Sequence, residues 1–279
     1  MRSGSHGATG ATLFGPGIFV ADSVTIPGGE VAGNVLIAGS HCGVYAAYLA
    51  ARAKVRAVIL NDAGIGLDQA GIAGLGYLDR IGVPAAAIDH ESARIGDGRD
   101  TAARGIVAFV NETAAALGCE PGLAVVEAAT RLQSAAPAGC LVPALREGRH
   151  SLDVPGAGFE VVALDSASLV AAEDEGRIIV TASHGGLLGG DRDTALKIVA
   201  RAVFFNDAGV GCDRAGISRL PELERRGIPA GTVSHWTARI GDARSSWKTG
   251  VLSHLNRAAE GAGAKPGMAL REFISAIAR

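Results

Sequence analysis

Short runs of apolar residues, each followed by polar or glycine-rich residues, recur along the chain. Such runs, bounded by turn-forming residues, predict buried strands. The expected strands are 35–39, 57–60 and 85–88, then 178–182, 202–205 and 230–233, with earlier ones near 18–20 and 161–164. Alanine and leucine recur at helical spacing between them. Strands that alternate with helices predict parallel βαβ units, and therefore an α/β fold.

A further helix is expected after the third strand of each group. Asp100 is a suitable N-cap in the first group and Gly118 a suitable end, while Ser245 and Gly263 match them in the second group. The pattern predicts one continuous helix over about 100–118, with an equivalent over about 245–263.

The hydrophobic and polar pattern occurs twice. Residues 61–97 and 206–242 are identical at 21 of 37 aligned positions. Beyond these segments, Asp22 and Asp165 each stand 19 residues before a histidine, His41 or His184. The repeat predicts a tandem duplication of a three-layer αβα unit with a parallel sheet, and two copies in one chain are expected to pack about a pseudo-twofold axis.

The limits of the repeat give the expected domain organisation. A flexible N-terminal tail over 1–15 precedes a first α/β repeat over 16–132, and a second repeat covers 159–279. The intervening 133–158 contains three prolines and four glycines and matches neither copy, which predicts a linker or crossover arm. The second copy also carries two extra residues in the glycine-rich stretch after His184.

Composition narrows the class of protein. The chain has 279 residues, of which 48% are hydrophobic but only 4% aromatic, so the core must be built from alanine, valine, isoleucine and leucine. A formal net charge of −2 without a run of basic residues argues against a nucleic-acid partner. The longest uncharged stretch, 31–51, is interrupted by polar residues and glycines, so no membrane association is expected.

The four cysteines lie far apart and form no CxxC pair; they are Cys42, Cys119, Cys140 and Cys212. Neither a structural zinc site nor a disulfide framework is indicated. Because the N-terminus also lacks a basic region followed by an apolar segment, a cytoplasmic location is expected.

Candidate chemistry lies at the carboxyl ends of the predicted strands, where parallel sheets bind ligands. Histidine there suits a general base or a metal ligand, although it could merely order a turn. Asp62 or Asp207 could orient His41 or His184 or coordinate a cation beside it, or could only cap the following helix. The expected catalytic residues are His41, Asp62, His90, His184, Asp207 and His235.

Arg94 and Arg239 are expected to hold a substrate carboxylate or an oxyanion with their planar guanidinium groups. Pairing with Asp97 or Asp242 is the alternative. Glycine-rich turns such as that at Gly64 suit an anion nest, and an aromatic wall and a mobile loop are expected in the second copy. The expected substrate-binding residues are Ser92, Arg94, Gly185, Gly186, Asn206, Trp236, Thr237 and Arg239.

Several common chemistries are excluded. Cys42 is matched by Gly185 in the other copy, so no thiol is present in both. A strand ending in Ser-His-Gly and a strand ending in Asp-Ala resemble the outline of caspase-like proteases, but Gly64 and Gly209 stand where those enzymes carry the nucleophile. No dinucleotide fingerprint or P-loop occurs, so NAD, FAD and ATP are not implied.

The sequence therefore predicts a hydrolase for a small polar or anionic molecule, acting on an amide, imide or related C–N bond. Histidine and aspartate would activate water, directly or on a divalent metal ion. Quasi-symmetric histidine and aspartate sets would also suit an isomerase, racemase or lyase, and a non-enzymatic module that binds small anions is the third alternative. A homo-oligomer is expected.

Overall fold

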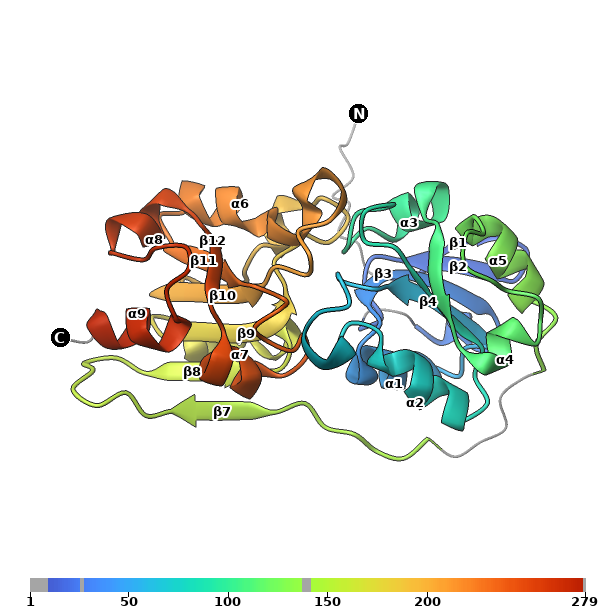
Figure 1. The fold of residues 1–279 in the computed structure, drawn as a ribbon, viewed down its shortest axis with the longest axis horizontal. Coiled ribbons are helices and arrows are strands. Elements are labelled where there is room, and N and C mark those ends of the chain that lie inside the picture. The colour runs from blue at the N-terminus through green and yellow to red at the C-terminus, as the bar shows by residue number, and fades with distance from the viewer. Residues whose placement is uncertain (1–9, 26–27, 137–141, 278–279) are drawn as a thin grey trace.

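The computed structural model describes residues 10–25, 28–136 and 142–277. They form two lobes that lie side by side, each built around a six-stranded sheet (Figure 1). The sheets are mostly parallel and interleaved with helices, which confirms the α/β class. Within the described residues, none of the helices is both long and apolar enough to span a membrane.

The two sheets have the same strand order and the same strand directions. Four parallel strands form the centre of each sheet, and an antiparallel strand lies at each edge. The first sheet contains β1 (Thr12–Gly15), β2 (Ile18–Ala21), β3 (Val35–His41), β4 (Ala57–Asn61), β5 (Ala85–Ile88) and β6 (Val107–Val110). The second contains β7 (Arg149–Leu152), β8 (Val161–Leu164), β9 (Ile178–His184), β10 (Ala202–Asn206), β11 (Ala230–Val233) and β12 (Leu252–Leu255).

Helices pack on both faces of each sheet, because the central strands present apolar side chains on both faces. In the first lobe, Leu36 and Val58 lie in the core under α1 and α2, whereas Val35 and Ile37 lie in the core under α3 and α5. The α-helices are α1 (Val44–Arg52), α2 (Ala73–Arg80), α3 (Gly98–Arg104), α4 (Glu112–Ala115), α5 (Val125–Leu132), α6 (Arg219–Arg225), α7 (Ala243–Thr249), α8 (Arg257–Gly261) and α9 (Leu270–Ala276). Short 3-10 helices cover Gly29–Val31, Leu67–Gln69, Ala167–Leu169, Ala172–Asp174, Arg192–Thr194 and Cys212–Ile217.

All eight central strands lie where the apolar pattern predicts them, but the continuous helices predicted over 100–118 and 245–263 are wrong. Asp97 and Asp242 are the N-caps, accepting hydrogen bonds from the amides of Asp100 and Ser245. Helices α3 and α7 end after seven residues, and the antiparallel strands β6 and β12 follow. Gly105, next to β6, is held so close to the carbonyl of Thr101 that a side chain there would overlap it.

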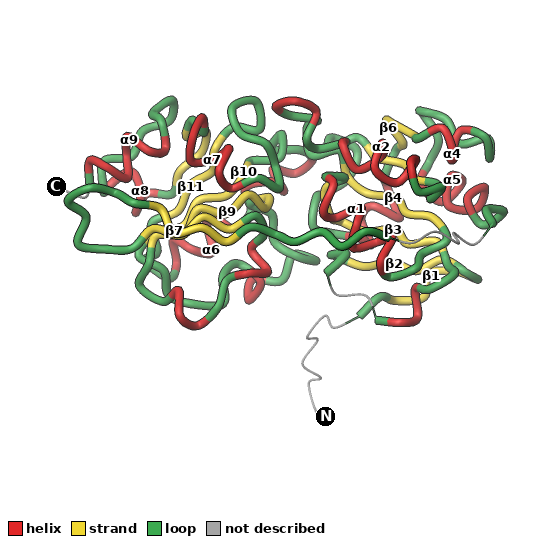
Figure 2. The backbone as a smooth tube through the Cα atoms, turned by 90° about the horizontal axis from the view of Figure 1, so that it is seen from below, coloured by secondary structure: helices red, strands yellow, loops and turns green. Residues whose placement is uncertain are grey.

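The segment between the repeats crosses from one lobe to the other. Arg56 donates hydrogen bonds to the carbonyls of Gln133 and Ala135, which ties the start of this segment to the first lobe. From residue 142 the chain runs along the molecule toward the second lobe and enters the second sheet as β7 (Figure 2). Neither β7 nor β1 is predicted, because neither is a buried apolar run and each gains its order by pairing with a sheet edge.

Two left-handed turns meet where the lobes join. All four residues over 63–66 have positive φ, including Ile65 at 65°, and the equivalent 208–211 repeats this conformation. A Cβ on Gly64 would lie 2.8 Å from the Cα of Gly209. The amide of Leu67 donates to the carbonyl of His235 (2.7 Å), so each turn is fixed against the other lobe.

Candidate functional site

His41 and His184 are the last residues of β3 and β9, and both order a turn. The Nδ1 atom of each ring accepts a hydrogen bond from a backbone amide two residues ahead, Gly43 or Gly186, at 3.1 Å. An accepting Nδ1 places the ring proton on Nε2. Burial lowers the pKa of His41 to about 4, so its imidazole is neutral and offers an N–H donor.

His184 is more deeply enclosed, with only 6% of its surface exposed. Burial, the charge of Arg219 and the nearby His41 together hold its pKa well below the ordinary value for histidine. A neutral ring whose Nδ1 already accepts a hydrogen bond is a donor and not a general base. The structure therefore does not support the base role that the sequence suggests for His41 and His184.

A cavity of about 340 Å³ opens beside His41 at the junction of the two lobes and the interlobe segment. The first lobe contributes His41 and Tyr45, the second contributes Asp165 and Arg239, and the interlobe segment contributes Glu147. A smaller cavity of about 60 Å³ shares His41 and Glu147 and extends to His184. Two of the six expected catalytic residues, His41 and His184, thus line one small cavity.

Glu147 is the carboxyl group of this cavity whose pKa lies near neutral pH. Burial is the main cause that raises its pKa to about 7; a hydrogen bond with Ser166 opposes this rise, and the neighbouring Asp165 adds to it. Asp165 accepts hydrogen bonds from the amides of Gly148 (2.6 Å) and Ala243 (2.9 Å). Asp165 thus holds the backbone next to Glu147 against the second lobe.

Asp62 and Asp207 do not reach His41 or His184, which corrects one expected pairing. The Nδ1 atom of His90 lies 2.9 Å from Oδ1 of Asp62, and that of His235 lies 2.7 Å from Oδ1 of Asp207. Burial lowers the pKa of His90, but Asp62, together with nearby Asp89 and Glu91, outweighs it and leaves that pKa raised. Burial acts to raise the pKa of Asp207, but hydrogen bonds from His235 bring it below the usual value.

These two Asp–His pairs pack across the lobe junction and do not line the 340 Å³ cavity. A Cβ on Gly209 would lie 2.6 Å from the ring of His90, and one on Gly64 would lie 3.0 Å from the ring of His235. Each ring therefore covers a glycine of the opposite lobe. Their immediate effect is to join the lobes.

One of these pairs belongs to a group that could hold a metal ion. Ligand atoms of Asp62, Asp89 and His90 all lie within 4.8 Å of one another. Two carboxylates and an imidazole are a suitable ligand set for a divalent transition metal. The residue equivalent to Asp89 is Ser234, so the second lobe does not repeat this set.

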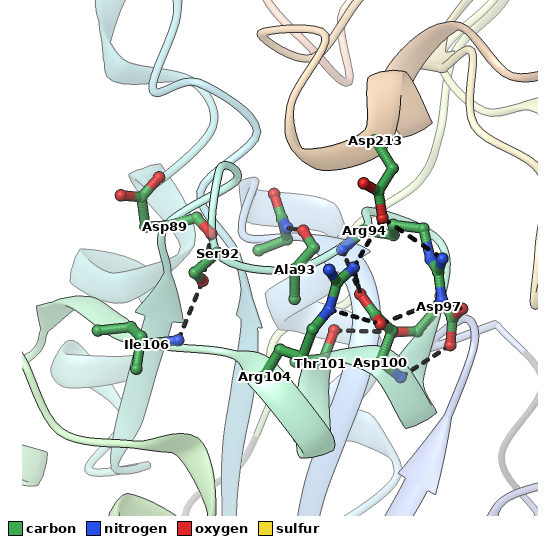
Figure 3. Close-up of polar contacts among 11 residues, drawn as sticks. Asp89, Ser92, Ala93, Arg94, Asp97, Asp100, Thr101, Arg104, Ile106 and Asp213 are labelled. Carbon is green, nitrogen blue, oxygen red and sulfur yellow. Dashed lines mark hydrogen bonds and ion pairs between the residues drawn. The ribbon is translucent and has the colours of Figure 1, made fainter.

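Arg94 and Arg239 are both engaged by carboxylates of the protein. Figure 3 shows Arg94 beside Asp100 (3.1 Å) and, across the junction, Asp213 (3.4 Å), with Arg104 bound to the same two carboxylates. Arg239 pairs with Asp68 of the opposite lobe at 2.6 Å. The expected pairing with Asp97 and Asp242 also occurs, at 3.4 and 3.5 Å. Each guanidinium thus already has carboxylate partners, and the two side chains are 44% and 48% exposed.

The glycine-rich turns are not open anion nests either. The amides of Ala63 and Gly64 donate to the side chains of Asn61 and Asp62, and that of Gly66 to the carbonyl of Gly64. The second lobe repeats this arrangement. There Asn206 is fully buried and bonded to the backbone, so it cannot contact a substrate.

The other expected substrate-binding residues have local structural roles. Ser92 joins the carbonyl of Asp89 to the amide of Ile106 (Figure 3), and Thr237 makes the equivalent contacts. Gly185 and Gly186 allow close packing, since side chains there would lie 2.6 and 2.8 Å from backbone carbonyls.

The aromatic wall predicted in the second copy is absent from this cavity. Trp236 is 63% exposed and packs against His235, with 4.7 Å between ring centroids, and it does not line the 340 Å³ cavity. Tyr45, from the first lobe, provides the aromatic surface instead.

Cysteine chemistry is absent from the described part of this site. Burial, and then the charge of Asp62, raises the pKa of Cys42 to about 12, so its thiol stays protonated. Cys42, Cys119 and Cys212 are free thiols, and Cys140 lies outside the described residues.

Sequence reasoning missed Glu147 because it belongs to the segment that matches neither repeat. Its neighbour in the fold, Asp165, carries a signal, since Asp22 repeats it at the same distance from a histidine. Only the path of the chain beside the second lobe brings Glu147 to His41.

Comparison with known proteins gives no matching family model, curated protein or solved structure. The functional argument therefore depends on the geometry of the site.

Proposed function

We propose that this protein is an enzyme that hydrolyses a C–N bond of a small amide, imide or related molecule in the cavity beside His41. The observation that carries the proposal is the pairing, in one cavity, of a neutral imidazole donor with a carboxyl group whose pKa is about 7. A catalytic group is most effective when its pKa is near the working pH.

The proposed reaction uses Glu147 twice. Ionised Glu147 takes a proton from a water molecule, which attacks the carbonyl carbon of the substrate. The Nε2–H of His41 donates to the oxyanion that forms. Protonated Glu147 then gives its proton to the leaving nitrogen as the C–N bond breaks, so water and amide become carboxylic acid and amine. No step uses the Asp62, Asp89 and His90 group.

We also propose that the lobes arose by tandem duplication and are related by a pseudo-twofold axis, with one catalytic centre in the chain. The matching strand orders and the 21 identities support the duplication. Glu147 lies two residues before β7, whereas Gly10 lies two residues before the corresponding strand β1. The carboxyl group of the proposed active site therefore has no counterpart in the first half of the chain.

The test is a screen of small amides, imides and ureas for release of ammonia or amine, followed by variants on any substrate found. Glu147→Gln is expected to lower kcat by about 10²-fold to 10⁴-fold, the usual contribution of general acid–base catalysis. Below pH 7, kcat/KM is expected to rise about tenfold per pH unit and then level off. Asp165→Asn should shift this profile, whereas the matched change Asp22→Asn should not. Unchanged turnover in Glu147→Gln would refute the proposal.

An isomerase, racemase or lyase is the second candidate, because a carboxyl base facing a neutral imidazole donor also suits proton removal next to a carbonyl group. Mass spectrometry separates the two. Hydrolysis transfers ¹⁸O from labelled water into the product, whereas proton abstraction and return transfers solvent deuterium to carbon. The binding of small anions gains no support from Arg94, Arg239 and the turn amides, which are engaged within the protein. Arg146 also lines the cavity, but carboxyl groups outnumber the arginines there.

A further inference from the structure

The two lobes differ most in the residues that follow His41 and His184. After His41 the chain enters α1 directly, which begins at Val44. After His184 the equivalent residue is Leu187, which starts a loop over 187–191 that contains the two-residue insertion. This loop extends across the junction to the first lobe.

The loop occupies the space beside Gly96. The amide of Gly189 donates to the Gly96 carbonyl at 2.8 Å. A side chain on Gly96 would overlap the carbonyl oxygen of Leu187 and lie 3.2 Å from Cε1 of His184. One N–H and one C=O of this turn, from Gly189 and Leu187, therefore lie next to the backbone of Gly96 and the ring of His184.

Gly241 is the equivalent glycine in the second lobe, and the space beside it is open. Its φ of 82° matches the 83° of Gly96. The nearest atom to a Cβ on Gly241 is Cε1 of His41, at 3.7 Å. Gly241 and His41 both line the 340 Å³ cavity. The open site thus has the same glycine and the same histidine as the filled one, without the loop.

We propose that the cavity binds a secondary amide of the peptide type, which occupies beside Gly241 the place that the loop occupies beside Gly96. The substrate N–H would donate to the Gly241 carbonyl, and its C=O would face the Nε2–H of His41. The assignment rests on the proposed function and narrows its substrate class from C–N compounds in general to molecules with a peptide-like N–H.

The remaining lining suits this ligand. Val44, Ala70, Ala73, Leu145 and Ile240 give the cavity an apolar wall. Four carboxyl groups line the cavity, and the two arginines there are Arg146 and Arg239, of which Arg239 pairs with Asp68. The excess of carboxyl groups disfavours a negatively charged ligand. A neutral amide with an apolar side chain satisfies both conditions, and a volume of about 340 Å³ fits a molecule of dipeptide size.

The experiment measures binding of N-acetyl-leucyl-glycine N-methylamide, which reproduces the loop residues Leu188 and Gly189, to the Glu147→Gln protein by calorimetry. The matched probe carries N-methylglycine in place of glycine and lacks the amide N–H. Loss of the hydrogen bond to the Gly241 carbonyl is expected to weaken binding about tenfold. Equal affinities, or no saturable binding of either probe, would overturn the assignment.

Two variants locate the binding. Val44→Phe narrows the cavity at its wall and is expected to weaken binding of the first probe at least tenfold. Val199→Phe, at an exposed position away from the cavity, should leave the affinity for this probe unchanged. Turnover of small imides or ureas without binding of this probe would refute the peptide-type substrate and leave the hydrolase standing. Specific binding of this probe without turnover of any amide would support the peptide-type ligand and refute the hydrolase.

Discussion

Burial shifts the pKa values of Glu147 and His41, which line the same cavity, in opposite directions. It disfavours the charged form of each, so the pKa of Glu147 rises to about 7 and that of His41 falls to about 4. Near pH 7 the carboxyl group can take up and return a proton, while the imidazole stays a neutral donor. One physical cause thus gives two different chemical roles.

The raised pKa of Glu147 predicts a pH-dependent cost in stability. The native state binds this proton more tightly than the unfolded chain, so the contribution of Glu147 to stability is present below pH 4.5 and is lost as the pH rises through about 7. At pH 8.5 the free energy of unfolding of Glu147→Gln, measured in urea, is expected to exceed that of the native protein by roughly 1 to 2 kcal/mol after solvent screening. At pH 4 the two proteins should be equally stable.

The control is Glu120→Gln, at an exposed carboxyl in the first lobe. It should leave the urea midpoint unchanged at both pH values. A Glu147→Gln protein that is equally stable relative to the native protein at pH 4 and pH 8.5 would contradict a raised pKa at this position.

The Asp62, Asp89 and His90 group predicts selective metal binding in one lobe. If the group binds a divalent ion, Asp89→Ser, which copies the second lobe, should weaken Zn²⁺ or Mn²⁺ binding at least about tenfold, the order expected for loss of a carboxylate ligand. Calorimetric titration of both proteins measures this. The reverse change in the second lobe, Ser234→Asp, serves as the matched variant, and an unchanged affinity in Asp89→Ser would exclude the group as a ligand set.

At the scale of elements, the left-handed turns at the junction are the most constrained parts of the chain. Four consecutive residues with positive φ are unfavourable for side chains such as Ile65 and Val210. Hydrogen bonds from each turn to the side chains at its own strand end, together with contacts to the opposite turn, offset this cost. The turns persist because both lobes hold them.

Gly64→Ala tests how closely the turns approach. The substitution adds a Cβ that would overlap Gly209, so the variant is expected to lose about 2 to 4 kcal/mol of stability in urea unfolding, from backbone strain and overpacking together. Gly82→Ala separates the two causes, because Gly82 has a similar φ of 69° and no neighbouring atom within 4 Å. It should lose only about 1 kcal/mol. Equal losses would mean that the contact with Gly209 contributes nothing.

At the scale of the whole molecule, the junction is tied unequally on its two sides. Arg94 and Arg104 share Asp100 and Asp213 on one side (Figure 3), whereas Arg239 and Asp68 form the main cross-lobe pair on the side of the cavity. The hydrogen bonds of Arg104 to Asp100 and Asp213 raise its pKa above the ordinary value. We expect the lobes to separate more readily beside the cavity than at this network.

Asp213→Asn is expected to lower stability by about 1 kcal/mol or less, because the carboxylate is half exposed, and Asp68→Asn by a smaller amount. Urea unfolding at 0.05 M and 0.5 M NaCl measures both, and the difference from the native protein should shrink at high salt because salt screens these charges. A loss that does not depend on salt would point to packing instead of charge.

The sequence alone determined the positions of the central strands, because each is a local apolar run. It also determined which residues of the two halves correspond, because the same residues recur in both. It also indicated that polar residues gather at the strand ends. It could not distinguish which aspartate meets which histidine. Asp62 lies 21 residues from His41 and 28 from His90, and only the register of β3, β4 and β5 brings it to the second.

Only the tertiary structure decided where the candidate active site lies. Glu147 follows no pattern in the sequence, and it meets His41 because the segment between the repeats runs past the junction. The same holds for the loop beside Gly96, which occupies one of two equivalent spaces and leaves the other open. Local patterns specify elements through backbone preference and burial, whereas a cavity is formed by side chains far apart in the chain, whose meeting depends on how the lobes pack.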